Sequence, residues 1–413
     1  MPSFLRPESS LLLAFHSHSF HHTAISFLIM YFNPIHLHFY LLLIVVALSF
    51  SLNVYHQHPL QLDEASTSRR MILGIRGNRY SYGRIEVQDP SGDVQWKWRP
   101  SNIHKTSYLP DGVKSCITSG PSVTEVKWAA NGTKILAVVG NAAIILNYAP
   151  DNPVLDQHIE FAICVHHTHT LELLPDDFVA VATTGKTPLD GIKIYDLNIS
   201  KPMLDEPDPR PVQTIRDFPA VHGLLWDGIS KKLWAVGNDK SPAGEEGPSQ
   251  GLLRGYEFKP DFCRRNALDV EHVEEYFVSD PKKLDVEWPK YDYWDGPHDL
   301  AGIPNTRKML IATDLDVFGF DVDSQTFLNA SEVDGYLKGF DPVSRPSSLP
   351  RSDIKCISIN GNGEVMYVQS EWEEYFGTDV RILETDGGVK KIPISTSLYK
   401  ARWFAEVPGW SAA

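Results

Sequence analysis

The chain has 413 residues, with 38 Lys and Arg against 52 Asp and Glu, so its formal net charge is −14. That charge, together with the lack of any long basic run, excludes a nucleic-acid-binding surface, which needs clustered cations. Aromatic residues make up 11% of the chain and charged residues 22%, which is typical of a globular protein with a large core. Several small domains or one large all-β domain would fit this length.

The first 65 residues differ from the rest because they are rich in His, Phe, Ser and Leu. The apolar run 38–52 suits the core of a signal peptide better than a membrane span, which needs about 20 residues. The stretch before this run is long for a signal peptide, so we expect Met30 to be the physiological start. We therefore predict an N-terminal extension over 1–65 that carries a signal peptide, with an uncleaved signal anchor as the alternative.

Glycosylation sequons and cysteines are compatible with secretion. Three sequons begin at Asn131, Asn198 and Asn329. The four cysteines lack metal-binding spacing and could form up to two disulfides or remain buried thiols: Cys116, Cys164, Cys263 and Cys356. We expect a secreted monomeric glycoprotein with no stable membrane association after signal cleavage.

After residue 70 the pattern changes to short apolar strands with a period of two, separated by Gly, Asn, Asp and Pro. Similar segments recur, each with a strand that carries a polar residue, a turn, a strongly apolar strand and a third strand. The clearest copies span 168–197, 221–258 and 297–321. Irregular repeats at intervals of about 40 to 75 residues predict the blades of a β-propeller.

The two ends of this region are complementary. Residues 400–407 resemble an inner strand with no blade after it, whereas 71–75, 84–89 and 94–98 resemble outer strands with no inner one. We therefore predict a single all-β propeller over 70–413, closed by a composite blade that both ends build. Six inner strands are expected near residues 127, 169, 222, 298, 355 and 402, and the interval 222–298 could hold a seventh.

The inner strands of a propeller line its axis, so polar residues at one position of successive copies would meet in a central funnel. The residues at that position are Lys127, His169, His222, His298, Lys355 and Arg402. A one-residue change of register would turn these side chains to the other face. Arg254 and Asn238 are further candidates for binding a substrate.

Cations beside histidines predict an anionic substrate, because Arg and Lys bind carboxylates. In a uronide the proton on C5 becomes acidic only when the adjacent carboxylate is neutralised, so β-elimination needs a cation, a base and an acid. Histidine titrates near neutral pH and can serve as the base or the acid. A hydrolase that uses two carboxylates is less favoured, because no carboxylate recurs at the funnel position.

Each histidine also has a structural interpretation. His166 and His167 could be solvated loop residues, and each funnel histidine could be a buried residue bonded to a strand end. For His298, the neighbouring Asp299 could act as a turn carboxylate that orients the imidazole.

The strings 168–175, 221–227 and 297–300 resemble a family of secreted bacterial and fungal propellers. More distantly, the chain is similar to propeller-type polysaccharide lyases, including the fungal L-rhamnose-α-1,4-D-glucuronate lyases. This resemblance implies seven blades, a histidine that serves as base and acid, and Arg or Asn at the substrate carboxylate. On this chain it points to His169 as the base, supported by His222 and His298.

A related type of propeller lyase holds a divalent metal with several histidines, so the three central histidines could bind Mn, Zn or a similar ion. We expect a polysaccharide lyase that acts on an acidic poly- or oligosaccharide. The alternative is a non-catalytic propeller that binds a glycan or a protein. Scaffold propellers often repeat Gly-His and Trp-Asp pairs in every blade, but this chain has Trp-Asp only at 226–227 and at 294–295.

Overall fold

The computed structural model describes residues 69–410, apart from 79–80, 106–107, 186–189, 201–209, 244–246, 263–265, 285–292, 345 and 373. The expected signal peptide, the alternative anchor and the start at Met30 lie outside the described residues. Among the residues that the structure describes, no helix is long and apolar enough to cross a membrane. The described chain is all-β, and its strands pair antiparallel.

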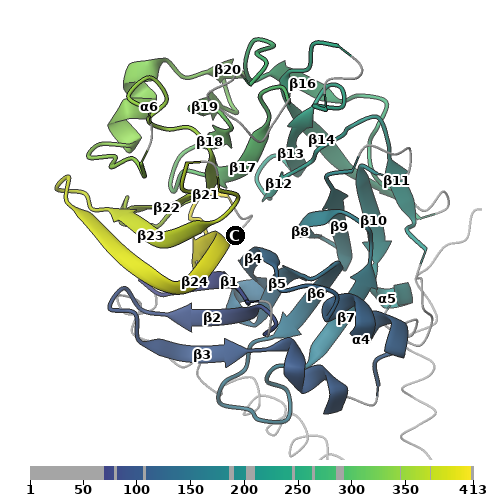
Figure 1. Ribbon diagram of the computed structural model, residues 1–413. Helices are drawn as coiled ribbons and strands as arrows, with labels where there is room; N and C mark the ends of the chain where they lie inside the picture. Colours follow the sequence, from purple (N-terminus) through teal and green to yellow (C-terminus); the bar gives the residue numbers. More distant parts are fainter. Residues whose placement is uncertain are drawn as a thin grey trace, which may run out of the picture. The chain divides into compact units, whose positions relative to one another are not determined.

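Four of the five sheets are built from consecutive segments (Figure 1). The first contains β4 (Val123–Ala129), β5 (Lys134–Val139), β6 (Ala142–Asn147) and β7 (Ile159–Cys164). The second contains β8 (Thr168–Leu174), β9 (Phe178–Thr183), β10 (Ile192–Asp196) and β11 (Gln213–Ile215). The third contains β12 (Gly223–Asp227), β13 (Lys232–Asn238), β14 (Gly251–Asp261), β15 (Asn266–Leu268) and β16 (Glu274–Phe277). The fourth contains β17 (Pro297–Gly302), β18 (Lys308–Thr313), β19 (Val317–Asp321) and β20 (Thr326–Phe327).

The fifth sheet joins the two ends of the described chain. Its strand order is β21 (Ile354–Ile359), β22 (Val365–Gln369), β23 (Gly377–Leu383), β24 (Val389–Trp403), β1 (Met71–Arg76), β2 (Arg84–Gln88) and β3 (Val94–Trp98). The end of β24 pairs with β1, so that Trp403 lies opposite Met71 and Leu398 opposite Ile75. The predicted pairing of the two ends is therefore confirmed, although the last strand ends at Trp403.

The first strands of the five sheets, together with β24, contact one another in a ring (Figure 1), and these six strands are called the first strands below. They are β4, β8, β12, β17, β21 and β24, and β24 in turn contacts β4. The interval between His222 and His298 holds the single sheet of β12–β16, so within the described residues it contains no seventh repeat.

Apolar side chains fill the space between neighbouring sheets. Phe161 and Ile163 of the first sheet pack with Val179 and Val181 of the second. Trp234 lies in the layer between the third and fourth sheets. Because the sheets carry apolar residues on both faces, each is buried only when it lies between two neighbours.

Polar turn residues determine where the first hairpin of a sheet reverses. Asn131, Asp177 and Asn305 follow β4, β8 and β17, with φ angles of 51°, 59° and 57°. Asn and Asp tolerate this left-handed conformation better than other residues with a side chain. The Asn and Asp residues that separate the apolar runs in the sequence therefore fix the start of each second strand.

The described helices are short: η1 (Pro100–Lys105), α4 (Asp111–Ile117), η2 (Ala130–Gly132), α5 (Leu197–Ser200) and α6 (Ala330–Tyr336). Helix α6 begins with a capping box, in which the Asn329 side chain accepts from the backbone N–H of Glu332 and the Glu332 side chain accepts from that of Asn329. Connections of this kind complete the sheets without adding a helical layer.

One disulfide selects among the cysteine pairings that the sequence left open. Cys116 of α4 is bonded to Cys164 at the end of β7. Cys356 is a free buried thiol, and Cys263 lies outside the described residues. The disulfide therefore fastens the segment after η1 to the outer strand of the first sheet.

We expect the variant Cys116→Ala/Cys164→Ala to lose roughly 2–4 kcal/mol of unfolding free energy, because the bond closes a 48-residue separation and restricts the unfolded chain. Urea unfolding followed by tryptophan fluorescence measures the loss. An unchanged midpoint in the double variant would contradict it.

Candidate functional site

A β-bulge recurs where the first strands enter the centre of the ring. In four strands one residue is extra relative to the partner strand: Thr124 in β4, His169 in β8, His298 in β17 and Lys355 in β21. In β24, Tyr399 and Lys400 together lie opposite the single residue Gly74. A bulge places two consecutive residues where a regular strand places one, and it re-aims their side chains.

These bulges correct the predicted register. Four of the six predicted positions occupy equivalent places, at His169, His222, His298 and Lys355. In β4 and β24 the equivalent residues are Thr124 and Tyr399. Lys127 and Arg402 lie three residues further along their strands, so the six predicted residues do not share one level.

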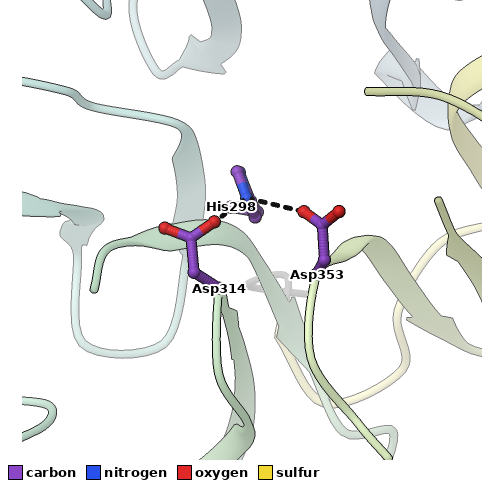
Figure 2. A group of neighbouring side chains, drawn as sticks. All are labelled: His298, Asp314 and Asp353. Atoms are coloured by element: carbon purple, nitrogen blue, oxygen red, sulfur yellow. Dashed lines mark hydrogen bonds and ion pairs between the residues drawn. The ribbon is translucent and has the colours of Figure 1, made fainter. Parts of the chain in front are cut away.

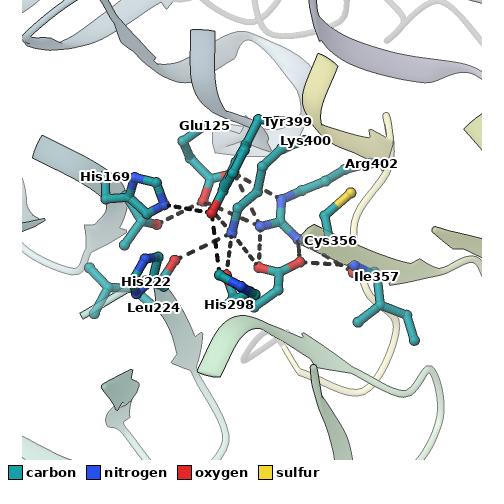
Figure 3. Close-up of polar contacts among 12 residues, drawn as sticks. Glu125, His169, His222, Leu224, His298, Cys356, Ile357, Tyr399, Lys400 and Arg402 are labelled. Atoms are coloured by element: carbon teal, nitrogen blue, oxygen red, sulfur yellow. Dashed lines mark hydrogen bonds and ion pairs between the residues drawn. The ribbon is translucent and has the colours of Figure 1, made fainter. Parts of the chain in front are cut away.

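The residues that follow the bulges form a buried ionic cluster of Glu125, Asp299, Lys400 and Arg402 (Figure 3). Lys400 Nζ and Arg402 Nη2 each lie 2.7 Å from Asp299 Oδ1, and Arg402 Nε donates to Glu125 Oε1 at 3.1 Å. The side chains of Glu125, Asp299 and Lys400 are completely buried. The two cations hold the pKa values of both carboxyls below their ordinary range, although burial alone would raise them.

This ionic cluster is bonded to every first strand. Thr170 of β8 donates to Glu125 at 2.8 Å, and the backbone N–H of Ile357 in β21 donates to Asp299 at 3.0 Å. Lys400 also donates to the carbonyls of His298 in β17, at 3.0 Å, and His222, at 3.3 Å, which precedes β12. The cluster thus sets the depth at which each first strand enters the centre.

The three predicted histidines converge on one side of the ionic cluster (Figure 3). The ring centroids of His169 and His222 are 4.3 Å apart, and those of His222 and His298 are 5.2 Å apart. Tyr399 lies between two of them, with its hydroxyl 3.2 Å from His169 Nε2 and 3.3 Å from His298 Nδ1. The expected convergence is therefore observed, and Tyr399 is the residue that joins its members.

The tautomer of His222 follows from its hydrogen bond. Its Nδ1 lies 2.7 Å from the carbonyl oxygen of Ala220, which can only accept, so Nδ1 carries the proton. In the neutral ring Nε2 then holds the lone pair, and no described residue hydrogen-bonds to it. The backbone thereby presents the basic nitrogen of His222 away from Ala220.

His298 lies in a different electrostatic environment (Figure 2). Its Nε2 is 2.7 Å from Asp314 Oδ1 and 3.3 Å from Asp353 Oδ1. Burial and the Lys355 ammonium lower the pKa of His298, but the two carboxylates outweigh them and raise it above the ordinary value. Protonated His298 donates from both nitrogens, so Tyr399 accepts from it and donates its own proton to His169.

The other groups of this site stay neutral. Burial, reinforced by the neighbouring histidines and lysines, lowers the pKa values of His169 and His222 well below that of a free imidazole. Burial also raises the pKa of Tyr399 well above the ordinary value. The neutral side chains of His169, His222 and Tyr399 therefore lie beside His298, which retains its proton more strongly than the other two histidines.

A cavity of about 250 Å³, here called the histidine cavity, opens beside these groups. His222, His298, Lys355 and Tyr399 line it, whereas His169 lies behind Tyr399 and does not. The remaining polar and aromatic lining comprises Thr184, Asn238, Tyr293, Trp294, Asp314 and Tyr375. Among small-molecule sites, which usually measure about 300–1,000 Å³, this is a small cavity with many polar groups.

The predicted cations are already paired. Lys127 contacts Glu172 at 2.7 Å, Lys355 contacts Asp353, and Arg402 contacts Glu125 and Asp299. The expectation of a positive funnel is therefore wrong, because carboxylates balance the central cations. No carboxylate recurs at the bulge position itself, but Glu125 and Asp299 follow that position in β4 and β17.

Two other predicted site residues differ in their placement. Arg254 lies on β14, away from the histidine cavity, where it pairs with Glu275 at 2.7 Å and stacks over Phe218. Asn238 does line the histidine cavity, but its amide donates to Ser249 Oγ and to the Asp295 carbonyl. Arg254 is therefore separate from the site, and Asn238 supports its wall.

The residues that could bind a metal ion in the structure differ from the three histidines that the sequence predicted. Within the described residues, the group that could hold an ion is His298, Asp314 and Asp353, with ligand atoms within 4.8 Å of one another. His169 and His222 are not part of it. Lys355 Nζ lies 3.0 Å from His298 Nε2 and forms an ion pair with Asp353, so an ammonium already contacts two of the three ligands.

A second cavity of about 370 Å³ lies further along the same first strands, beyond the ionic cluster. We call it the tryptophan cavity, because Trp128, Trp226, Trp403 and Trp410 line it. Lys127, Glu172 and Arg402 supply its charged groups. Lys127 and Arg402 therefore face a region different from the one that the histidines face.

Sequence reasoning missed the part that five residues play in the site: Glu125, Asp314, Asp353, Tyr399 and Lys400. It also gave Asp299 a different role. The predicted turn carboxylate Asp299 instead belongs to the ionic cluster. Adjacent polar residues at the start of an apolar strand, as in Tyr399-Lys400 and His298-Asp299, are the signal that could have indicated a bulge.

Comparisons with known proteins add little. No protein-family model matches the chain, and no curated protein matches it. A chain in the crystal structure of the mitotic checkpoint complex aligns with a TM-score of 0.40 and 12% identity, covering 83% of this chain and 86% of that chain. A functionally unknown protein from Desulfotomaculum acetoxidans DSM 771 aligns with a TM-score of 0.44 and 9% identity, covering 83% and 97%. At these values the likeness carries no conclusion about function.

We expect Lys400→Met to cost about 3–5 kcal/mol of unfolding free energy, because it leaves Asp299 and Glu125 with one cation in a dry environment. Guanidinium unfolding measures the loss. The control Lys259→Met removes a half-exposed lysine from a surface ion pair and should leave the midpoint unchanged. Equal midpoints for both variants would contradict a central role for the ionic cluster.

A second prediction concerns the pKa of Asp295. Burial, together with the nearby Asp314, raises this pKa from 3.8 to about 7. The folded state then binds a proton that the unfolded state has lost, so the stability is lost as pH rises from about 4 through about 7. We expect Asp295→Asn to flatten the fall in melting temperature between pH 5 and pH 8, and exposed Asp280→Asn to leave it unchanged. Parallel curves for Asp295→Asn and wild type would contradict this assignment.

Proposed function

We propose that residues 70–413 form a six-bladed β-propeller. Three observations support this architecture: the ring of first strands, the apolar layer between each pair of neighbouring sheets, and the sheet that both ends build. In this arrangement each of the first four sheets is one blade, and the fifth sheet supplies two blades, β21–β23 and β24 with β1–β3. Six blades are proposed in place of the seven that the resemblance implied.

We further propose that the protein is a carbohydrate-active enzyme that cleaves a uronic-acid-containing glycan by β-elimination in the histidine cavity. The observation that carries this proposal is the placement of a free imidazole nitrogen on His222 and a phenol on Tyr399 in one cavity. The aromatic lining from Tyr293, Trp294 and Tyr375 suits the apolar faces of sugar rings.

In the proposed reaction His222 Nε2 removes the proton from C5 of the uronate. The electron pair of that C–H bond forms the C4–C5 double bond, and the bond from C4 to the glycosidic oxygen breaks. Tyr399 donates its proton to the departing oxygen, and His298 replaces it through the 3.3 Å contact between Nδ1 and the phenol oxygen. The lowered pKa of His222 and the raised pKa of Tyr399 keep the first an acceptor and the second a donor.

This assignment moves the base from His169 to His222. His169 Nε2 accepts from Tyr399 when His298 is protonated, and His169 does not line the histidine cavity. His169 is therefore a positioning residue for Tyr399. Lys355 and His298, which both line the cavity, are the positive groups available to the carboxylate of an acidic poly- or oligosaccharide.

Secretion is part of the proposal. Disulfides persist mainly in oxidising compartments, and the Cys116–Cys164 bond fits such an environment. The three sequon residues, Asn131, Asn198 and Asn329, are exposed in the described chain and would be accessible to glycosylation. N-terminal sequencing of protein from the culture medium tests both the leader and the start at Met30.

A second candidate is a non-catalytic propeller that binds a glycan or a protein. One observation favours it: the central cations are already paired with carboxylates, which weakens the attraction for an anionic substrate. Saturable binding of a uronide without any product would select this candidate.

The lyase proposal predicts an increase in ultraviolet absorbance from unsaturated uronide when the protein meets glucuronate-bearing arabinogalactan or gum arabic. We expect His222→Ala and Tyr399→Phe each to lower kcat by about 100-fold or more, since each removes a proton-transfer group. His169→Ala should cause a smaller loss. The exposed loop residue His166 provides the matched control, and His166→Ala should retain full activity.

Two results would count against this proposal. Folded wild-type protein that forms no unsaturated product from any uronide polymer would remove the lyase reaction. A larger loss in His169→Ala than in His222→Ala would return the base to His169. Circular dichroism and unfolding midpoints of the variants show whether a loss of activity reflects loss of fold.

A further inference from the structure

Three potential metal ligands, which Figure 2 shows, lie close together beside the histidine cavity, and one lysine contacts two of them. His298 is the bulge residue of β17, Asp314 follows β18, and Asp353 precedes β21. One imidazole and two carboxylates are donors that suit Mn²⁺ or Zn²⁺. Lys355, two residues after Asp353, brings its ammonium to the same place.

We propose that the Lys355 ammonium is the resident cation of the His298, Asp314 and Asp353 group, and that the wild-type protein binds no divalent metal there. A metal ion would need the lone pair of His298 and the charge of the carboxylates. Lys355 Nζ lies 3.0 Å from His298 Nε2 and is ion-paired with Asp353, so a positive charge already occupies the place between these two ligands that a metal ion would take.

Burial makes this arrangement hard to displace. The side chains of Lys355 and Asp353 are 5% and 3% exposed. Moving the ammonium away would separate a buried ion pair, which is strongly unfavourable. Lys355 is also joined covalently to the chain two residues after Asp353, so the cation cannot diffuse away as a metal ion can.

The absence of a metal at this site does not depend on the proposed function. Only the role of Lys355 in catalysis rests on that function. In a uronide lyase, Lys355 would supply next to the substrate carboxylate the positive charge that a divalent ion supplies in a metal-dependent enzyme. Its position beside His298 would place two positive groups at one wall of the histidine cavity. Lys355 is thus both a substrate-binding candidate and the reason that the site needs no metal.

Removal of the lysine should create a metal site. We expect Lys355→Ala to bind Zn²⁺ at least about tenfold more tightly than the wild type, since the repulsion of one buried positive charge is lost. Isothermal titration with Zn²⁺ alone measures affinity and stoichiometry, and the melting temperature should rise with Zn²⁺ in the variant but not in the wild type.

Two controls locate the new site. Lys127→Ala removes a similarly buried, ion-paired lysine of the same ring, where the described neighbours include no comparable ligand group, and should gain no Zn²⁺ binding. Lys355→Ala/Asp314→Asn should lose the binding that Lys355→Ala gains. If Lys355→Ala does not fold, titration of the wild type still tests the proposal. Stoichiometric binding of Zn²⁺ or Mn²⁺ by the wild type would overturn it, provided that Asp314→Asn abolishes this binding.

These readouts do not depend on activity, so the resident cation and the lyase reaction can fail separately. Zn²⁺ binding by Lys355→Ala, together with none by the wild type, upholds the resident cation even when no uronide is cleaved. Where the wild type is active, chelation with EDTA should leave its rate unchanged. A chelator-sensitive rate that Mn²⁺ restores would overturn the proposal and leave the lyase reaction intact.

Discussion

The pairing of Asp299 and Glu125 with Lys400 and Arg402 is the interaction on which the centre of this protein depends. A buried charge is tolerated only when oppositely charged partners and hydrogen bonds satisfy it. Here those partners come from every first strand of the ring, through side chains and through the carbonyls of residues 222 and 298. If a first strand were shifted by one residue along its axis, a buried charge would lose its partner. The ionic cluster therefore fixes the register of the first strands as well as their contacts.

The ionic cluster also divides the centre of the ring. On β17, His298 faces the histidine cavity, Asp299 belongs to the cluster, and residues 300–302 line the tryptophan cavity. The order on β24 is the same, from Tyr399 through Lys400 to Arg402. The bulges allow consecutive residues to serve these different purposes, which a regular strand with a period of two does not permit.

The sequence predicted the all-β class, the pairing of the two ends and the convergence of the histidines, because these depend on local patterns that repeat. It misplaced Lys127 and Arg402 by three residues, because Thr124 and Tyr399, which occupy the equivalent places, do not stand out as charged or histidine residues in the strand pattern. It could not predict the ion pairs, because Glu125 and Arg402 are 277 residues apart and only the folded ring brings them together. The same limit concealed Tyr399, which resembles an ordinary strand aromatic.

The paired state of the central cations constrains how an acidic ligand could bind. The net charge of −14 repels an anion at long range, and the ionic cluster presents no excess positive charge to offset it. Attraction must therefore arise locally, at Lys355 and His298, where Asp353 and Asp314 are the existing partners. In the proposed lyase reaction, a substrate carboxylate would have to share Lys355 with Asp353, and the C5 proton would become acidic only to the extent that Lys355 neutralises the substrate carboxylate instead of Asp353. Specificity in such a site depends on competition between two carboxylates for one ammonium rather than on the strength of a positive surface.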